Sequence, residues 1–457
     1  MMRTDRLWNP DRELMDADRL DQLRLDKLRK QLDYIYQHSE FYREKFQDAG
    51  AHPSDIRDMD TFRQLPVFLD KEVHRRSQED SMAKYGHGFG TFVCTPMDRL
   101  ALVSSTSGTT GAPTYYLFTK HDLDVQAEVA ARQIKRTGCG PGDIILHGAA
   151  MSGLYLAGAP LIYYGFYHQL GTMIPLGAEP GAQKLLETLL VTRATALIAT
   201  PSYLNYLHEA APDMIGRDTS ELGIRILFAI GEPGAGLPEV RKKLNEAYQA
   251  EVYDLIGPGT NFAAVSCDHE TYQGMHVVSA DYAIHEDVID PVTKKPLKIE
   301  NGVIGEQIRT ALDREAGPFV RYSVGDMIQI FTDPCPCGLP GHRIKVVGRV
   351  DDMLIVKGVN VFPGGIKNVI TSFVPRVTGE FRIVLTEAPP RVVPPLKLKV
   401  ERGTEVDPSQ IEDLKKALGQ ELHARLRVRP DIEILPPETL ARATKKTDWF
   451  ERLYQSD

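Results

Sequence analysis

The middle of the chain alternates short apolar runs with longer stretches that carry apolar residues at helical spacing. The apolar runs span five or six residues, a usual length for a buried strand, and turn-forming residues bound them. This alternation predicts an α/β layered domain whose strands are largely parallel. The predicted strands cover 143–147, 169–174, 196–200, 225–230 and 251–256, and the predicted helices include 182–193 and 238–249.

The two ends of the chain follow other patterns. Leucines and aromatic residues at helical spacing predict an amphipathic helical entry over 17–47. Shorter runs and turns fill 274–329, where the stretch from Asp290 to Pro296 is typical of a β hairpin. A smaller second domain is expected after residue 347, so the predicted domains are 1–347 and 348–457. Its predicted elements are strands at 381–386, 396–400 and 431–435 and a helix over 407–426 that begins at Asp407 and Pro408.

A loop rich in hydroxyl groups and glycine lies between two apolar runs, over residues 104–114. Glycines let the backbone approach an anion, successive amides can surround it, and Ser and Thr add short donors. The composition therefore favours a polyphosphate ligand, although a polar hairpin turn remains an alternative. The loop lacks the Gly-Lys-Ser/Thr ending of the common nucleoside-triphosphate loop, so another nucleotide-binding architecture is needed.

The composition is that of an ordinary globular protein with a mildly acidic charge. A length of 457 residues predicts at least two domains. The 54 basic and 62 acidic residues give a net charge of −8 without a dense basic tract, which argues against nucleic acid as a partner. We expect neither a secretory signal nor a membrane span, because no apolar run has the required length. Five cysteines make no disulfide framework in a chain this long and favour the reducing cytoplasm.

Further motifs accompany the hydroxyl-rich loop in order along the chain. They are Thr200-Pro201-Ser202-Tyr203, Gly231-Glu232-Pro233, Arg321 to Asp326, Cys335-Pro336-Cys337-Gly338, Gly348 to Pro363 and Ala441 to Lys446. In order and spacing they resemble the adenylate-forming acyl-CoA synthetases, and in particular the phenylacetate-CoA ligase branch. The resemblance runs from about Tyr34 to the end of the chain. It implies an α/β fold with a large N-terminal adenylate-forming domain of layered sheets and helices and a small, mobile α+β C-terminal domain.

The resemblance also assigns a nucleotide site. It implies that the hydroxyl-rich loop holds the β- and γ-phosphates of ATP and that the turn at 231–233 flanks adenine. Asp326 would accept both ribose hydroxyls, a task that suits a carboxylate, although a turn aspartate is the alternative. Arg349 would hold ribose or phosphate. The implied cofactor-binding residues are Ser107, Gly108, Thr109, Thr110, Gly111, Gly231, Glu232, Pro233, Asp254, Thr260, Asp326, Arg349, Lys357 and Gly358.

The implied reaction explains why such a site is needed. A carboxylate does not react with a thiol at neutral pH, so ATP must first convert it to an acyl-adenylate, which CoA then attacks. Lys446 matches the family lysine that neutralises charge during adenylation, with Lys445 as the alternative register and a solvated basic tail as the alternative role. Asp351 matches the pivot about which the small domain rotates between the two half-reactions. Lys446 and Asp351 are therefore the expected catalytic residues.

Magnesium is the weakest part of the match. The family has a glutamate that helps to bind the cation where this chain has Thr260, after Ile256-Gly257-Pro258-Gly259. Either Thr260 orders a water-coordinated Mg²⁺, or adenylation is slow, altered or lost.

A structural zinc site is also expected. Cys335 and Cys337 lie close together, and Cys267 and His276 are separated by a short turn-rich segment. Together they form a Cys₃His set suited to tetrahedral Zn²⁺. His269 is the substitute ligand, and buried thiols without metal are the alternative interpretation.

The substrate is expected to be a small aromatic carboxylic acid, with ATP and CoA as the other small-molecule partners. Tyr155 and Tyr203 lie in loops next to motifs and could line a slot for a flat acid near Gly257, although most such residues are core. Two alternatives stay open: an adenylate-forming enzyme with an amine or a carrier protein as acceptor, and a non-catalytic binding homologue. The sequence also leaves open whether the protein is a homodimer.

Overall fold

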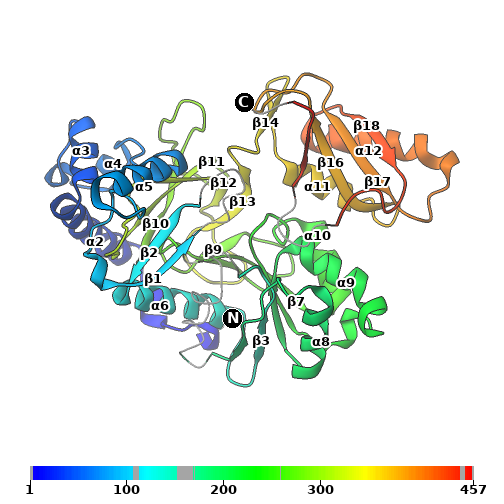
Figure 1. The fold of residues 1–457 in the computed structure, drawn as a ribbon, viewed down its shortest axis with the longest axis horizontal. Coiled ribbons are helices and arrows are strands. Elements are labelled where there is room, and N and C mark those ends of the chain that lie inside the picture. Colours follow the sequence, from blue (N-terminus) through cyan, green and yellow to red (C-terminus); the bar gives the residue numbers. More distant parts are fainter. Residues whose placement is uncertain are drawn as a thin grey trace.

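The computed structural model describes residues 4–105, 113–151, 168, 170–257, 259–442 and 448–454. Within these ranges the chain forms two parts, which Figure 1 shows side by side. The large part is built on an 11-stranded sheet, whose last strand in the sequence is β13. The small part, which follows in the sequence, is built on a four-stranded sheet. The small part lies at the upper right of Figure 1, in orange and red.

One half of the large sheet is parallel, as the strand and helix alternation predicts. Its strands lie in the order β4-β3-β5-β6-β7, and every neighbouring pair among them is parallel. The carboxyl ends of β5, β6 and β7 therefore lie at one edge of the sheet. The strands are β3 (Ile144–His147), β4 (Thr172–Ile174), β5 (Ala196–Ala199), β6 (Ile226–Ala229) and β7 (Glu251–Ile256).

Helices cover both faces of this parallel half because successive strand residues point to opposite faces. In β5, Leu197 packs into the core cluster that contains α8, α9 and α10, whereas Ala196 and Ile198 pack into the cluster that contains α6. The parallel half is thus a three-layer structure. Its helices are α6 (Lys120–Arg136) on one face and α8 (Ala182–Thr192), α9 (Pro201–Ile215) and α10 (Pro238–Tyr248) on the other.

The other half of the large sheet is antiparallel, so the expectation of largely parallel strands holds only for the first half. The direction changes between β7 and β8, and the sheet continues in the order β8-β9-β13-β12-β11-β10. The expected hairpin near Asp290 is confirmed, because Asp290 lies in the turn between the antiparallel strands β10 and β11. The strands are β8 (Ala264–Ser266), β9 (Met275–Val277), β10 (Ala283–Ile289), β11 (Ile304–Ala311), β12 (Tyr322–Phe331) and β13 (Arg343–Arg349).

The N-terminal helices pack against the antiparallel half. The expected helical entry is two helices, because the backbone is extended at Ser39, which ends α2 and whose hydroxyl accepts from the amide of Tyr42 in α3. Arg24 of α2 forms a buried ion pair with Glu286 of β10 at 2.6 Å. The helices are α1 (Pro10–Glu13), α2 (Ala17–His38), α3 (Glu40–Asp48), α4 (Met59–Arg63) and α5 (Lys71–Tyr85), and the hairpin β1 (Leu100–Ser105) and β2 (Tyr115–Thr119) follows them.

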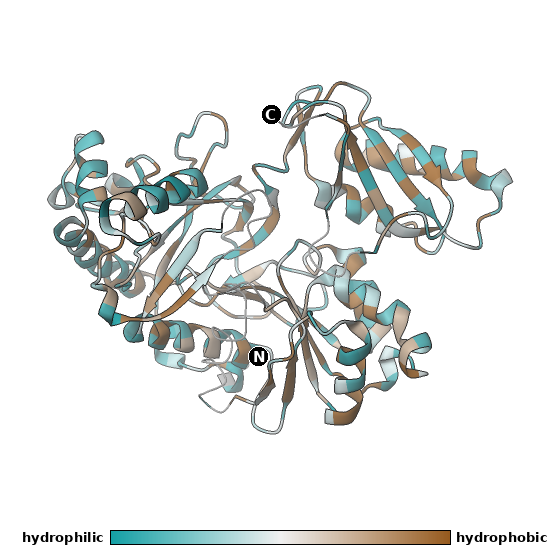
Figure 2. Cartoon of the chain, viewed as in Figure 1, coloured by the Kyte–Doolittle hydropathy of each residue, from teal (hydrophilic) through white to brown (hydrophobic). Residues whose placement is uncertain are grey.

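The small part has its own hydrophobic core between its sheet and two helices. Its strand order is β18-β17-β16-β19, with a separate β14-β15 hairpin packed into the same core. In Figure 2 its strands alternate between hydrophobic and hydrophilic residues. No helix in the described ranges has the length and hydropathy that a membrane span requires. The elements are β14 (Leu354–Val356), β15 (Val359–Val361), α11 (Pro363–Thr371), β16 (Val377–Leu385), β17 (Lys397–Arg402), α12 (Ile411–Leu426), β18 (Asp431–Leu435) and β19 (Phe450–Arg452), and 3-10 turns lie at Thr4–Arg6, Pro53–Asp55, Met97–Arg99, Thr219–Glu221 and Pro408–Gln410.

Candidate active site

Predicted residues follow three neighbouring parallel strands where those strands end. Thr200 follows β5 and begins α9, the turn at 231–233 follows β6, and Gly257 follows β7. Gly231 has a φ of +84°, a conformation that favours glycine. Glu232 is buried, and its carboxylate accepts a hydrogen bond of 2.7 Å from the amide of Ser202. This edge is the usual position of ligands in an open α/β sheet.

Asp326 lies between two guanidinium groups from neighbouring strands. Its Oδ2 accepts from Nη2 of Arg309 in β11 at 3.1 Å, and its Oδ1 accepts from Nη1 of Arg349 in β13 at 3.0 Å. Nε of Arg349 also donates to Oδ1 of Asp351 at 2.8 Å, just beyond the end of β13. Four charged side chains therefore form a continuous row in which the two signs alternate.

The electrostatics of this row follow from burial and pairing. Burial would lower the pKa of Arg349, but Asp326 and Asp351 outweigh burial and raise it above its ordinary value. Burial would likewise raise the pKa of Asp351, and Arg349 holds it below its usual value. Gly325 makes the approach feasible, because a Cβ there would lie 2.9 Å from Nη2 of Arg349. Arg349 and Asp351 therefore favour each other's charged forms.

The strand that follows the hydroxyl-rich loop contacts β12, which belongs to this row. Its central residues, Ser107 to Gly111, lie outside the described residues, but both flanking strands are described. Gln78 of α5 clamps the base of the loop, since its side chain accepts from the amide of Tyr115 at 2.8 Å and donates to the carbonyl of Pro113 at 3.1 Å. The hydroxyl of Tyr116 in β2 lies 3.1 Å from that of Tyr322 in β12, the strand that carries Asp326.

The segment after β7 contains Thr260, which stands at the position of the family's magnesium-binding glutamate. Thr260 is buried, and its hydroxyl has no hydrogen-bond partner among the described residues. Arg314 fixes this segment by donating to the carbonyl of Gly259 at 3.2 Å. Asp254 in β7 accepts a hydrogen bond of 2.7 Å from Tyr272, and burial raises the pKa of Asp254.

Other predicted residues belong to elements other than β11, β12 and β13, or lie outside the described residues. Lys357 and Gly358 form the exposed two-residue turn between β14 and β15, where both have positive φ, as a type I′ turn requires. Tyr203 is buried in the core around α9, where its ring stacks on Tyr206. Tyr155, Lys445 and Lys446 lie outside the described residues.

The four residues of the predicted zinc site come together in space. Sγ of Cys267 lies 3.9 Å from Sγ of Cys335, and Sγ of Cys337 lies 3.3 Å from Nε2 of His276. All four donor atoms lie within 4.8 Å of one another. The substitute His269 is not a member of this set, and its ring instead contacts the backbone of Thr271. A cavity of about 370 Å³ opens beside the cluster.

The thiols of this cluster differ in acidity. The Cys337 thiol donates a hydrogen bond that lowers the pKa of Cys267, whereas burial raises the pKa of Cys335. The pairing of β9 with β13 brings the cluster together. It places His276 opposite Arg343, close to the loop before β13 that carries Cys335 and Cys337. The three cysteines are free thiols in the structure.

Motif reasoning missed Arg309 and Gln78. Both act through a partner that is distant in sequence: Arg309 reaches Asp326 from the neighbouring strand, and Gln78 reaches the loop from a helix. Arg309 is buried, and a buried arginine requires a charged or hydrogen-bonding partner. No local pattern in the sequence identifies that partner.

Comparisons with known proteins match the chain along almost its full length. Residues 358–451 match the AMP-binding enzyme C-terminal domain. The phenylacetate-coenzyme A ligase of Thermus thermophilus is 29% identical over 460 residues, which cover 96% of this chain and 97% of that protein. The phenylacetate-coenzyme A ligase of Pseudomonas putida is 30% identical over 366 residues and covers 77% of each chain.

Solved structures of one ligase match this chain to different degrees in different states. The 2-hydroxyisobutyryl-CoA ligase in the postadenylation state, in complex with R3-HIB-AMP, gives a TM-score of 0.87 at 29% identity and covers 98% of this chain and 93% of that one. The same ligase with 2-HIB-AMP and CoA in the thioesterification state gives 0.69 at 30% identity and covers 99% and 94%. The two parts of this chain are therefore arranged more as in the postadenylation structure.

Proposed function

The chain belongs to the phenylacetate-CoA ligase-like branch of the adenylate-forming superfamily, and on this basis we propose that it activates an aromatic carboxylic acid with ATP and transfers the acyl group to CoA. The observation that carries the proposal is the charged row that crosses the neighbouring strands β11, β12 and β13. Asp326 lies there between Arg309 and Arg349, beside the strand that leaves the hydroxyl-rich loop.

The first half-reaction forms the acyl-adenylate. A carboxylate oxygen of the acid attacks the α-phosphorus of ATP, the bond from that phosphorus to the bridging oxygen breaks, and pyrophosphate leaves with the electron pair. We assign the β- and γ-phosphates to the loop residues Ser107 to Gly111, adenine to the turn at 231–233 and ribose to Asp326. Lys446 would neutralise the charge that develops on the α-phosphate oxygens.

The second half-reaction forms the thioester. The sulfur of CoA attacks the acyl carbon, its proton is released, and AMP leaves with the oxygen that joined it to the acyl group. We propose that the small part turns about Asp351 between the two half-reactions and that the domains are 1–347 and 348–457. The first strand of the small part begins at Leu354, close to this boundary, and the C-terminal family match begins at residue 358.

Magnesium would be held mainly by phosphate oxygens and water, because the chain has a threonine where the family has a glutamate. The buried hydroxyl of Thr260, which has no hydrogen-bond partner in the part of the chain that the structure describes, fits a site at which a coordinated water would accept or donate a hydrogen bond. Bound Mg²⁺ would neutralise phosphate charge. Asp254 is less suited to the cation, since burial raises its pKa and Tyr272 already donates to it.

A structural Zn²⁺ fits the Cys₃His cluster. With Zn–S near 2.3 Å and Zn–N near 2.0 Å, tetrahedral geometry requires an S···S distance of about 3.8 Å and an S···N distance of about 3.5 Å. The corresponding distances here are 3.9 Å and 3.3 Å. Cys267, His276, Cys335 and Cys337 would all be ligands and would close the coordination shell, so we assign the ion no part in catalysis.

The function is tested by pyrophosphate release from ATP with phenylacetate, benzoate or 2-hydroxyisobutyrate, each with and without CoA. We expect pyrophosphate with an aromatic acid, and loss of free CoA thiol only when ATP and that acid are both present. Activity with 2-hydroxyisobutyrate alone would contradict the aromatic assignment. Pyrophosphate release without any thioester would favour another acceptor, and no release with any acid would favour a binding protein.

The role of Lys446 is tested by measuring the half-reactions separately. We expect Lys446→Ala to reduce pyrophosphate release far more than it reduces thioester formation from supplied phenylacetyl-adenylate, because the lysine acts only in the first step. Lys445→Ala is the matched control and should affect both steps little. A larger defect in Lys445→Ala would move the assignment by one residue.

We place the enzyme in the cytoplasm, where ATP and CoA are present and the cysteines stay reduced.

A further inference from the structure

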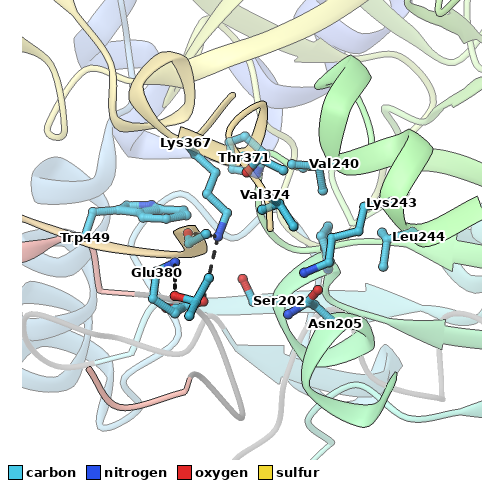
Figure 3. A pocket seen from close by; sticks show the side chains of 15 residues that line it. Ser202, Asn205, Val240, Lys243, Leu244, Lys367, Thr371, Val374, Glu380 and Trp449 are labelled. Atoms are coloured by element: carbon cyan, nitrogen blue, oxygen red, sulfur yellow. Dashed lines mark hydrogen bonds and ion pairs between the residues drawn. The ribbon is translucent and has the colours of Figure 1, made fainter. Parts of the chain in front are cut away.

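The two parts meet along a seam that carries several charged side chains. Figure 3 shows a small pocket on this seam, with Ser202, Asn205 and Lys243 on the side of α9 and α10 and Lys367, Glu380 and Trp449 on the side of the small part. The pocket has a volume of about 30 Å³, which is room for about one water molecule rather than for a substrate. The charged side chains along the seam, rather than this pocket, are therefore the features to consider.

Glu209 of α9 joins the two parts electrostatically. Its Oε1 lies 3.7 Å from Nζ of Lys243 in the same part, and its Oε2 lies 3.6 Å from Nε of Arg442 in the small part. The side-chain amide of Asn205 donates a hydrogen bond of 2.8 Å to Oε1. Glu209 is thus the carboxylate of the large part that faces Arg442.

Arg442 is also held within its own part. Its Nη2 donates to Oε1 of Glu401 at 2.7 Å, and the amide of Leu440 donates to Oε2 of the same buried carboxylate, also at 2.7 Å. Glu401 belongs to β17 and moves with the small part. Its contact with Arg442 can therefore persist in any arrangement of the two parts, whereas the contact with Glu209 requires the arrangement seen here.

Residue 442 directly precedes the segment 443–447, to which the proposed function assigns Lys446. We infer that Glu209 is a positioning residue, which holds Arg442 and thereby favours the arrangement in which Lys446 serves adenylation. This inference rests on the proposed function. The larger overlap of the whole chain with a postadenylation structure than with a thioesterification structure supports it. Rotation of the small part would separate Arg442 from Glu209 and leave Glu401 with Arg442.

The inference predicts a difference between the half-reactions. The Glu209 and Arg442 side chains are 37% and 23% exposed, so solvent screens their pairing, and we expect Glu209→Gln to slow pyrophosphate release about two- to fivefold. Glu209→Lys adds a cation beside Lys243 and Arg442 and should slow it further. Thioester formation from supplied phenylacetyl-adenylate and CoA should stay unchanged or become faster. Asp213→Asn, an exposed acidic position one turn further along α9, is the matched control.

The measurement is repeated at low and high salt. The ratio of the pyrophosphate-release rate of wild type to that of Glu209→Gln should shrink at high salt, because salt screens the attraction between Glu209 and Arg442. A merely structural role for Glu209 would lower both half-reactions equally and would not depend on salt in this way. Equal losses in both steps, or wild-type rates in both steps for Glu209→Lys, would refute the inference. A wild-type protein that releases no pyrophosphate with any acid would instead refute the proposed function, and the inference with it.

Discussion

The pairing of Asp326 leads to a specific prediction for ATP binding. We consider the replacement Asp326→Asn, which keeps the size of the side chain but removes its charge and one acceptor oxygen. The carboxylate has about four lone-pair positions. In the structure Arg309 uses one on Oδ2 and Arg349 uses one on Oδ1, so one position on each oxygen remains for a ribose hydroxyl.

The expected size of the effect follows from that count. Asparagine has a single acceptor oxygen, and at least one ribose hydroxyl would lose its charged partner. A hydrogen bond to a charged group contributes about 1.5–3 kcal/mol, so the KM for ATP should rise about 10- to 150-fold. The KM for the acid should change much less, because Asp326 is assigned to the ribose.

The assay is initial-rate pyrophosphate release at varied ATP with saturating acid. Asp213→Asn is the control, because it removes an exposed carboxylate of α9 that is not part of the charged row and should leave the KM for ATP near the wild-type value. A thermal melt of each variant shows whether the protein stays folded. If folded Asp326→Asn has a KM for ATP within about threefold of wild type, which is under about 1 kcal/mol, Asp326 does not bind the ribose.

Three further predictions concern the metal sites and stability. Purified protein should contain about one zinc per chain. Cys335→Ser should lower both the zinc content and the melting temperature, whereas the control Cys94→Ser should keep the metal. Metal-free wild-type protein of full stability would exclude the site. Glu286→Gln should destabilise the fold by about 3–5 kcal/mol in urea titrations, because it removes the buried charge partner of the Arg24 guanidinium and leaves it only the exposed carboxylate of Asp21. Burial would raise the pKa of Glu286, but Arg24 holds it well below its usual value. The difference in the free energy of unfolding between wild type and Glu286→Gln should therefore be full above about pH 5 and shrink at lower pH. A difference that stays constant down to about pH 3 would contradict this. Thr260→Glu should lower the Mg²⁺ concentration for half-maximal adenylation by adding an anionic ligand, whereas the neutral control Thr260→Gln should not. The same half-saturating Mg²⁺ concentration in wild type and Thr260→Glu would place residue 260 away from the cation.

The parallel half of the fold could be predicted from the sequence because its signals are local. Each strand there is a short run rich in apolar residues, and from β4 to β7 the next strand follows after one helix. The break at Ser39 was missed, since apolar residues at helical spacing continue beyond it as Phe41, Tyr42 and Phe46, and only the serine cap ends one helix and begins the next. The order of the antiparallel strands could not be predicted either, because β13 is inserted between β9 and β12 and no local pattern encodes such distant pairing.

The same distinction applies to the candidate site. The sequence indicated Asp326, Arg349 and Asp351 through contiguous motifs, and the structure brings them into one row. Arg309 completes that row from another strand and could be found only in three dimensions. The cysteine and histidine set was recognised as two separated halves, and its assembly depends on the register between β9 and β13.

The position of β13 has a consequence for how the protein is made. This strand pairs with β12 on one side and β9 on the other, and β9 leaves the ribosome well before β13. Until residues 343–349 emerge, β9 and β12 each present an unpaired edge, and such edges favour aggregation. A nascent chain that stalls before this point would depend on chaperones. One that has passed it can close the large sheet and, in the same step, bring the cysteine and histidine side chains of the proposed zinc site together.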